Sequence, residues 1–329
     1  MTPFRGSDGP GVLTVPPMAL AVLAGVILLL APFVIGNYWI RVVTTMFMFG
    51  ALASATNIIA GYTGYPAFGN VVFFGLGAYT TALAMTKFRT SFWTSLAVGI
   101  VICCLYAALI GFPLLRLRGH YFAIATLGMN EATRAIVENV GFTGGGMGLS
   151  LPVQRGDVQL LNLYFYFVML GLLLSAVVIT SCVISTRLGY GCRAIRFDEE
   201  AAASCGVPTT RYKVTAWMLS AALTGMAGAA YANWVGYIEP AAVFDMSIAV
   251  KMFVMMILGG AATVFGPLLG ALLVELVGLV AWTQLLNYHT ATLGVIIIAV
   301  VIFVPGGLMS LRQGLTVRRL LDNVRASRL

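Results

Sequence analysis

Long apolar stretches recur along almost the whole chain, and they limit what it can fold into. Hydrophobic residues make up 60% of its 329 residues and charged residues only 9%, whereas a soluble domain is about a quarter charged. The stretches predict an all-α polytopic membrane protein with about ten spanning helices of roughly 20 residues each, with eight or nine as alternatives. The ten candidates are Met18–Gly36, Ile40–Ala60, Pro66–Thr86, Phe92–Leu115, His120–Asn139, Leu161–Ser185, Val214–Gly236, Ser247–Ala262, Gly266–Trp282 and Thr290–Val304.

The basic residues give these helices an orientation. The 19 Lys and Arg outnumber the 11 Asp and Glu, and most lie between apolar stretches, so they indicate membrane topology and not nucleic-acid binding. The loops at 116–118 and 186–213 and the basic tail at 305–329 are therefore expected in the cytoplasm. Residues 1–17 then form a cytoplasmic N-terminal segment before an uncleaved first span, and 18–304 form the membrane domain. Arg41, Lys87 and Arg89 fall on the outer side in this topology, against the rule.

The chain carries no motif of an enzyme. None of its lysines follows a glycine, so there is no P-loop for ATP. It has neither a zinc-protease His-Glu-x-x-His motif nor a Gly-x-Ser-x-Gly motif. Its five cysteines show no metal motif or disulfide framework. We expect no catalytic residue, no bound metal and no cofactor on this chain.

The run GYTGYPAFGN, residues Gly61–Asn70, interrupts an otherwise apolar region. Backbone polar groups exposed by Gly, Pro and Thr at membrane depth need protein or a water-lined cavity, because lipid does not bond them. The run indicates either the wall of a translocation pathway, with a broken or re-entrant third span, or an ordinary interfacial turn. The amides that flank it are expected to bond an unwound backbone or a substrate. The candidate pathway residues are Asn57, Tyr62, Thr63, Gly64, Gly69, Asn70 and Glu131.

Charged residues also lie within the apolar stretches. Glu131 precedes Arg134 by three residues, on the same helix face, and a packed ion pair fits this spacing better than a pathway charge. Lys251, near the start of its span, can extend to the membrane interface, while Glu275 has no evident partner. By contrast, the small residues at 221, 225 and 229 recur every four positions and predict close helix packing.

The segment DEEAAASCG, residues Asp198–Gly206, concentrates acidic residues in the middle of the chain. Gly189 and Gly191 punctuate the start of the loop that contains this segment, and Gly206 with Pro208 ends the helical part. The 3.6-residue period predicts one helix over Arg193–Cys205, which pairs Arg196 with Glu200 and places Ala194, Phe197, Ala201 and Cys205 on an apolar face. So short a helix is marginal alone, so it is either a solvated loop helix or one that inserts into a partner's groove.

Glu200-Ala201-Ala202, followed by Gly206, is similar to the EAA loop of ABC importer permeases, although the distal Ile-x-Leu-Pro portion of that pattern is not evident. The wider chain, from about residue 50 to 310, resembles branched-chain amino acid ABC transporter permeases of the M type. The motifs that carry this resemblance are GYTGYPAFGNVVFFGLGAYTTAL, RLRGHYFAIATLGMNEATR, FTGGGMGLS, RLGYGCRAIRFDEEAAASCGVPTTRYKVTAWMLSAALTGMAGAAYA and LGGAATVFGPLLGALL.

The resemblance implies a permease subunit of an importer in the bacterial inner membrane. Its implied partners are membrane lipid, a second permease subunit, a periplasmic substrate-binding protein and two ATPase subunits, which bind the ATP and Mg. The resemblance extends to importers of urea, short-chain amides and aromatic acids. The alternative from another class is an ion-gradient-driven secondary transporter or channel, with Glu131 and Glu275 as ion sites. The implied ATPase-coupling residues are Arg193, Arg196, Phe197, Asp198, Glu199, Glu200, Ala201, Ala202 and Gly206.

Overall fold

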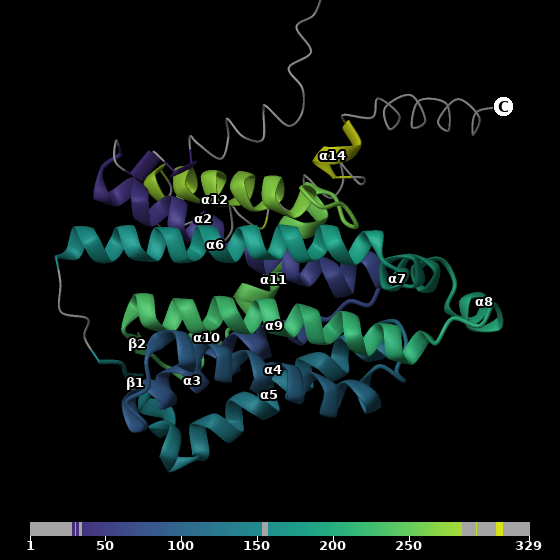
Figure 1. Ribbon diagram of the computed structural model, residues 1–329, viewed down its shortest axis with the longest axis horizontal. Helices are drawn as coiled ribbons and strands as arrows, with labels where there is room; N and C mark the ends of the chain where they lie inside the picture. Colours follow the sequence, from purple (N-terminus) through teal and green to yellow (C-terminus); the bar gives the residue numbers. More distant parts are fainter. Residues whose placement is uncertain are drawn as a thin grey trace, which may run out of the picture.

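The fold is a bundle of long helices that run side by side (Figure 1). The computed structural model describes residues 28–29, 31–32, 35–152, 157–284, 294 and 307–311. Its long helices are α2 (Asn37–Thr56), α3 (Val71–Lys87), α4 (Phe92–Leu114), α5 (His120–Asn139), α6 (Val158–Ser185), α9 (Thr209–Val235), α11 (Met246–Gly259) and α12 (Gly266–Gln284). The shorter elements are η1 (Asn57–Gly61), η2 (Phe68–Asn70), η3 (Gly141–Thr143), η4 (Gly145–Met147), β1 (Leu149–Ser150), α7 (Arg187–Phe197), α8 (Glu199–Ser204), β2 (Tyr237–Ile238), α10 (Pro240–Val243) and α14 (Leu308–Leu311).

The predicted all-helical membrane class is confirmed in outline, whereas the number of spans stays a prediction. Within the described residues, five helical segments are long and apolar enough to cross a membrane: Asn37–Gly61, Phe68–Lys87, Phe92–Leu114, Val158–Ser185 and Pro240–Gly259. The apolar part of α12, Gly266–Leu279, is shorter. The first predicted span lies mostly, and the tenth almost wholly, outside the described residues.

Helix α9 lies at the centre of the bundle and packs against α2, α3, α4, α6 and α7. It is 27 residues long but more polar than the five apolar segments. Other helices surround it, so it needs fewer lipid-compatible side chains. As the small-residue spacing predicted, its neighbours approach closely: a Cβ at Gly77 of α3 would overlap the carbonyl group of Gly225. Ala221 and Ala229 are fully buried, which confirms the packing role.

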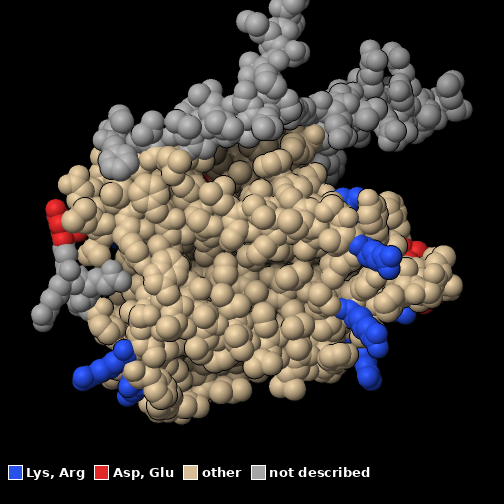
Figure 2. Space-filling model, in the orientation of Figure 1, with Lys and Arg blue, Asp and Glu red and all other residues tan. Residues whose placement is uncertain are grey.

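The two ends of the bundle differ in structure and charge. Helices α7 and α8 lie at one end, and the short antiparallel pair β1–β2 lies at the other (Figure 1). Charged side chains show at both ends, while the wide band between them carries none on the face drawn (Figure 2). Such a band suits the hydrocarbon core of a bilayer. Lys87 lies over the ring of Phe142 at the β1–β2 end, so it remains an exception to the charge rule under the predicted orientation.

The predicted pair between Glu131 and Arg134 does not form. Arg134 donates through Nε to Glu138 at 2.8 Å, and Glu131 is exposed on α5 instead of paired with it. Both spacings place the carboxylate on the same helix face, and the i, i+4 one forms. The Nζ of Lys251 lies 3.6 Å from Oε1 of Glu275, which gives that carboxylate its partner.

Candidate functional site

The acidic segment forms two helices, so the single helix predicted over Arg193–Cys205 was wrong. Helix α7 ends at Phe197 and α8 begins at Glu199, while Asp198 between them has extended backbone. The Asp198 carboxylate accepts hydrogen bonds from the N–H groups of Glu200 at 2.8 Å and Ala201 at 3.1 Å. This is an N-cap, and a capping aspartate starts a new helix because it occupies free backbone donors. Gly191 lies inside α7, where it packs against the Tyr212 ring, and does not mark the start of the helix.

The break redistributes the side chains of this segment. The predicted Arg196–Glu200 pair does not form, because Arg196 turns toward the bundle and Glu200 pairs with Arg118 at 2.5 Å. Phe197 is 92% exposed, whereas Ala202 is buried against the rest of the chain. Of the predicted apolar face, Phe197, Ala201 and Cys205 are exposed and Ala194 is half-buried, so most of this face points away from the bundle. Together α7 and α8 form a projection beyond the ends of the long helices (Figure 1); residues Arg187–Ser204 are called the coupling segment below.

Glu199 anchors α8 to the bundle through a buried cluster with Lys213 and Tyr65. The Lys213 ammonium is only 3% exposed and donates to Glu199 at 2.6 Å, to the Tyr65 hydroxyl at 2.9 Å and to the Leu115 carbonyl at 2.8 Å. The Tyr65 hydroxyl in turn donates to the Glu199 carboxylate. All three N–H donors of the Lys213 ammonium are thus hydrogen-bonded. Glu199, predicted to belong to a solvated polar side, is instead held inside, with its side chain 16% exposed.

The electrostatics of the cluster favour the ionised carboxylate. Burial disfavours the charge on Glu199, but the hydrogen bonds from Lys213 and Tyr65 outweigh it, so the pKa of Glu199 lies below its usual value. Burial raises the pKa of Tyr65, and the adjacent Glu199 charge raises it further, so the hydroxyl stays protonated and remains a donor. Both pKa shifts fit the same arrangement, in which the ionised Glu199 carboxylate accepts hydrogen bonds from Lys213 and from Tyr65.

Helix α7 also contacts the segment between α2 and α3. Arg196 donates through Nη1 to the Gly61 carbonyl at 2.6 Å, and the guanidinium of Arg193 lies 5.8 Å from the centre of the Tyr62 ring. Gly64 has φ of +76°, a conformation that glycine adopts without strain, and its backbone passes against Arg196. Residues Gly61–Asn70 are called the connection below; the coupling segment rests directly on it.

The connection is the interruption that the sequence predicted, and protein surrounds most of it. Helix α2 continues through the π-helix η1, and the chain then leaves helical structure at Gly64–Ala67 before η2 and α3. The third helix is therefore not broken internally; the interruption precedes it. Thr63 is buried and its hydroxyl donates to the Ile59 carbonyl. The carbonyls of Gly61, Pro66 and Ala67 accept hydrogen bonds from protein donors, as expected of irregular structure at membrane depth.

The two amides that flank the connection bond to distant helices. Asn57 is fully buried; its Nδ2 donates to the Thr263 carbonyl at 2.8 Å and its Oδ1 accepts from the Ala262 N–H at 2.8 Å. It therefore holds the turn between α11 and α12, an unwound backbone. Asn70 donates to Ser220 and Thr224 of α9, each at 3.1 Å.

Gly69 completes the contacts of the connection. A Cβ on Gly69 would overlap the carbonyl group of Thr126 in α5, so only glycine permits this approach. The structure thus gathers six of the seven predicted pathway residues, Asn57, Tyr62, Thr63, Gly64, Gly69 and Asn70, around one segment. The seventh, Glu131, lies apart from them on the exposed face of α5.

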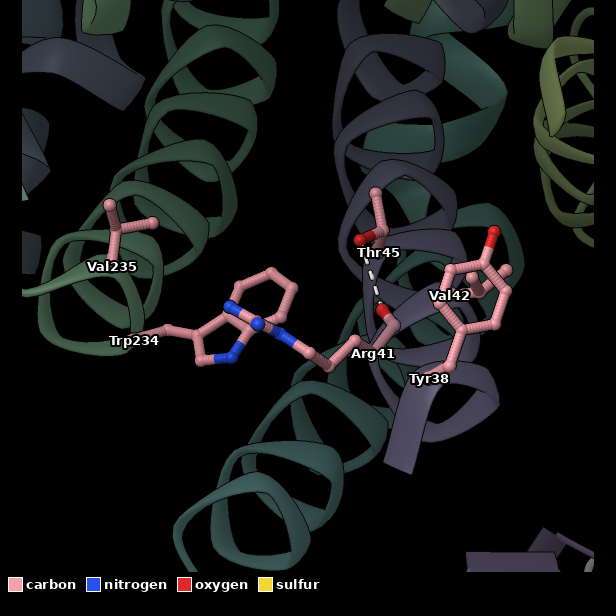
Figure 3. Close-up of a pocket in the computed structure, with 6 residues that line it drawn as sticks. All are labelled: Tyr38, Arg41, Val42, Thr45, Trp234 and Val235. Atoms are coloured by element: carbon pink, nitrogen blue, oxygen red, sulfur yellow. Dashed lines mark hydrogen bonds between the residues drawn. The ribbon is translucent and has the colours of Figure 1, made fainter. Parts of the chain in front are cut away.

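A cavity of about 390 Å³ lies far from these residues, between the start of α2 and the end of α9. Tyr38, Arg41, Val42, Thr45, Trp234 and Val235 line it. Figure 3 shows the Arg41 side chain reaching from α2 toward the Trp234 ring. None of these residues was predicted for the pathway, so the cavity and the predicted pathway do not coincide. Within the described part of the chain, no group of three or more His, Cys, Asp or Glu is placed to hold a metal ion.

Comparison with known proteins decides the family. A family model described as "Branched-chain amino acid transport system / permease component" matches residues 38–305. The chain belongs to this family. The permease is also similar to the "High-affinity branched-chain amino acid transport system permease protein LivM" of Salmonella typhimurium LT2. The two are 29% identical over 327 residues, and the alignment covers 90% of this chain and 75% of the relative.

A second relative of this permease carries the same description. It is the LivM protein of Escherichia coli K12, 28% identical over 313 residues, with 86% of this chain and 72% of the relative covered. No solved structure matches the permease significantly. The resemblance drawn from the sequence motifs is therefore confirmed at the level of a branched-chain amino acid transport permease.

Sequence reasoning missed the central part of the cluster. Tyr65 and Lys213 were not among the candidate residues, although Lys213 is one of the three lysines and directly precedes an apolar stretch. A lysine at that depth needs a carboxylate, and the acidic run lies nearest in sequence. That signal was sufficient to pair Lys213 with one of the acids, but not to place Tyr65 beside them.

Proposed function

We propose that this chain is the permease subunit of an ATP-driven ABC importer that moves branched-chain or related amino acids inward across the bacterial inner membrane. The observation that carries the proposal is the coupling segment, a projection beyond the bundle with Phe197 92% exposed at its α7–α8 junction. An exposed aromatic on a short helix suits a groove on another protein. The printed names of the two relatives support the substrate class.

In this proposal the chain does no covalent chemistry. Two partner ATPases bind ATP and Mg and receive α8 in a groove, a second permease completes the pathway, and a periplasmic protein delivers the substrate. Binding and hydrolysis of ATP change the affinity of the ATPases for the two orientations of the coupling segment. Only such a difference in affinity shifts a conformational equilibrium.

We assign the pathway to the connection and to the exposed face of α5. Glu131 is exposed on α5, and a carboxylate facing lipid tails costs several kcal/mol, so such residues face water or protein. The connection touches α5 through Gly69 and Thr126, and this contact supports a route that both elements share. The face of α5 that bears Glu131 then meets water or the second permease.

The proposal is tested by replacing Phe197 with Ala and Glu200 with Gln together in the assembled transporter. Loss of a buried aromatic anchor at an interface costs about 2 kcal/mol, so we expect roughly thirtyfold weaker binding of the ATPases. Phe142→Ala, an exposed phenylalanine at the opposite end, is the matched control and should bind normally. Unchanged co-purification of the ATPases with the double variant would remove the docking assignment.

A second measurement separates the importer from an ion-driven carrier. The purified chain alone, in liposomes with a proton or sodium gradient, should move no amino acid. The same liposomes should accumulate substrate once the ATPases, the second permease and the binding protein are present with ATP. Gradient-driven uptake by the chain alone would overturn the proposal.

A further inference from the structure

The coupling segment contacts the region between α2 and α3 at residues Gly61–Tyr65. Arg196 bonds the Gly61 carbonyl, Arg193 covers the Tyr62 ring, and Glu199 accepts a hydrogen bond from Tyr65. Lys213 then ties Glu199 and Tyr65 to the Leu115 carbonyl at the end of α4. The contacts come from both helices of the coupling segment, so they fix its position and its direction.

The same short connection contacts two further helices, α5 and α11. Gly69 abuts α5 at Thr126, and the Phe68 ring stacks on Phe253 of α11 with centroids 4.2 Å apart. The ring of Tyr65 meets Phe122 of α5 edge to face at 5.3 Å. One segment of ten residues thus joins the coupling segment to α5 and α11.

We propose that the connection is the element that receives the movement of the coupling segment, and that Tyr65, Glu199 and Lys213 are the positioning residues that make the two segments move together. This inference rests on the proposed function, because it assumes that partner ATPases displace α8. What it adds is the route by which displacement of α8 reaches α5 and α11.

The cluster suits this role because it is short, buried and charged. A link transmits movement only where it resists separation, and hydrogen bonds to ionised groups are the strong ones. The exposed Arg118–Glu200 pair, by comparison, is solvated and contributes little. The Tyr65 hydroxyl bonds the cluster, while the Tyr65 ring packs on α5. This one residue therefore joins the coupling segment to α5.

The test uses the complete transporter, reconstituted in liposomes, and measures substrate molecules moved for each ATP hydrolysed. Glu199→Gln with Lys213→Met removes both charges at once, so that neither is left buried alone. Tyr65→Phe removes the hydroxyl and keeps the ring. The controls are Lys251→Met with Glu275→Gln, the other Lys–Glu pair of the bundle, and Tyr166→Phe, whose buried hydroxyl bonds the Leu28 carbonyl.

We expect the double variant to assemble with the ATPases and hydrolyse ATP, but to move about tenfold less substrate per ATP, within the usual range of coupling between sites. Tyr65→Phe removes the two hydrogen bonds of the hydroxyl and should lower the ratio about fivefold, and both controls should leave it unchanged. A ratio that stays at the wild-type value in Tyr65→Phe and in the double variant would overturn the inference. Failure of the double variant to assemble leaves Tyr65→Phe to decide it.

A failure of the proposed function looks different from a failure of this inference. If the wild-type chain does not bind ATPases, the proposed function is wrong. If it binds them and transports, while the cluster variants transport equally well per ATP, only the route through the connection is wrong.

Discussion

The amide of Asn57 offers the sharpest test of how the connection is held. Sequence reasoning left two interpretations of this residue, a group that bonds unwound backbone or a group that bonds substrate. In the structure both halves of the amide bond the α11–α12 turn, through the Ala262 N–H and the Thr263 carbonyl, each at 2.8 Å. Replacement of Asn57 by Ala removes both bonds without adding bulk.

The size of the effect follows from what the substitution leaves behind. A buried polar group left without a partner costs roughly 1–3 kcal/mol, so two such groups cost roughly 2–6 kcal/mol. A water molecule that enters the vacated space recovers part of this cost, since two polar groups then face it. We therefore expect the free energy of unfolding to fall by about 3 kcal/mol.

The assay is reversible unfolding of the purified permease in mixed micelles, followed by circular dichroism. Asn139→Ala is the matched control, because Asn139 is exposed and its amide bonds only the Ala135 carbonyl of its own helix. Surface changes of this kind stay within about 0.5 kcal/mol. Substrate affinity of the assembled transporter is measured in parallel for both variants.

The two interpretations then give opposite results. A clamp on the turn predicts a large loss of stability and, in the molecules that remain folded, unchanged substrate affinity. Unchanged stability together with weaker substrate binding would refute the structural reasoning and place the amide against the substrate.

Other positions give three more tests. Gly69→Val should lower the thermal midpoint of the purified permease sharply, because its side chain overlaps the Thr126 carbonyl; a normal midpoint would contradict this packing. A membrane-impermeant maleimide applied from the cytoplasmic side should label the exposed Cys205 and spare Cys192, because burial raises the pKa of the Cys192 thiol to about 12. Peptide mapping reports the labelled sites. Labelling of Cys205 only from the outer side would reverse the predicted orientation. Since the pKa of Glu199 lies below its ordinary 4.5, its stabilisation of α8 is present above that pH and is lost as pH falls through the lower folded pKa. Amide exchange in α8, corrected for intrinsic rates, should thus stay level between about pH 6 and 8, and faster exchange within that window would count against the cluster.

Helix boundaries followed well from sequence where apolar stretches meet glycine, proline or charge. The predicted His120–Asn139 coincides with α5, and the predicted Phe92–Leu115 ends one residue beyond α4. Helix α9 differs, since it starts at Thr209 and not at Val214. The first turns of α9 include Lys213, whose positive charge led the predicted span to begin after it. In the structure the Glu199 carboxylate neutralises that charge. Hydropathy alone does not register such a partner.

The coupling segment shows why its internal geometry was not predictable from periodicity. The period of 3.6 residues runs through Asp198 without interruption, but the aspartate bonds backbone donors ahead of it and starts a second helix. The partner of Arg196 lies 135 residues away, at Gly61. Local spacing favoured Glu200, since that residue is four positions on. A long-range backbone acceptor has no signature in a single sequence.

The three acids that stand together in this apolar chain are therefore not one feature with one role. Asp198 caps α8, Glu199 binds Lys213 inside, and Glu200 pairs with Arg118 at the surface. Since each has a partner within the chain, little net charge remains for an ATPase to recognise. What remains free is Phe197. The acids thus set the position and direction of the projection, and recognition by the partner falls to this exposed ring.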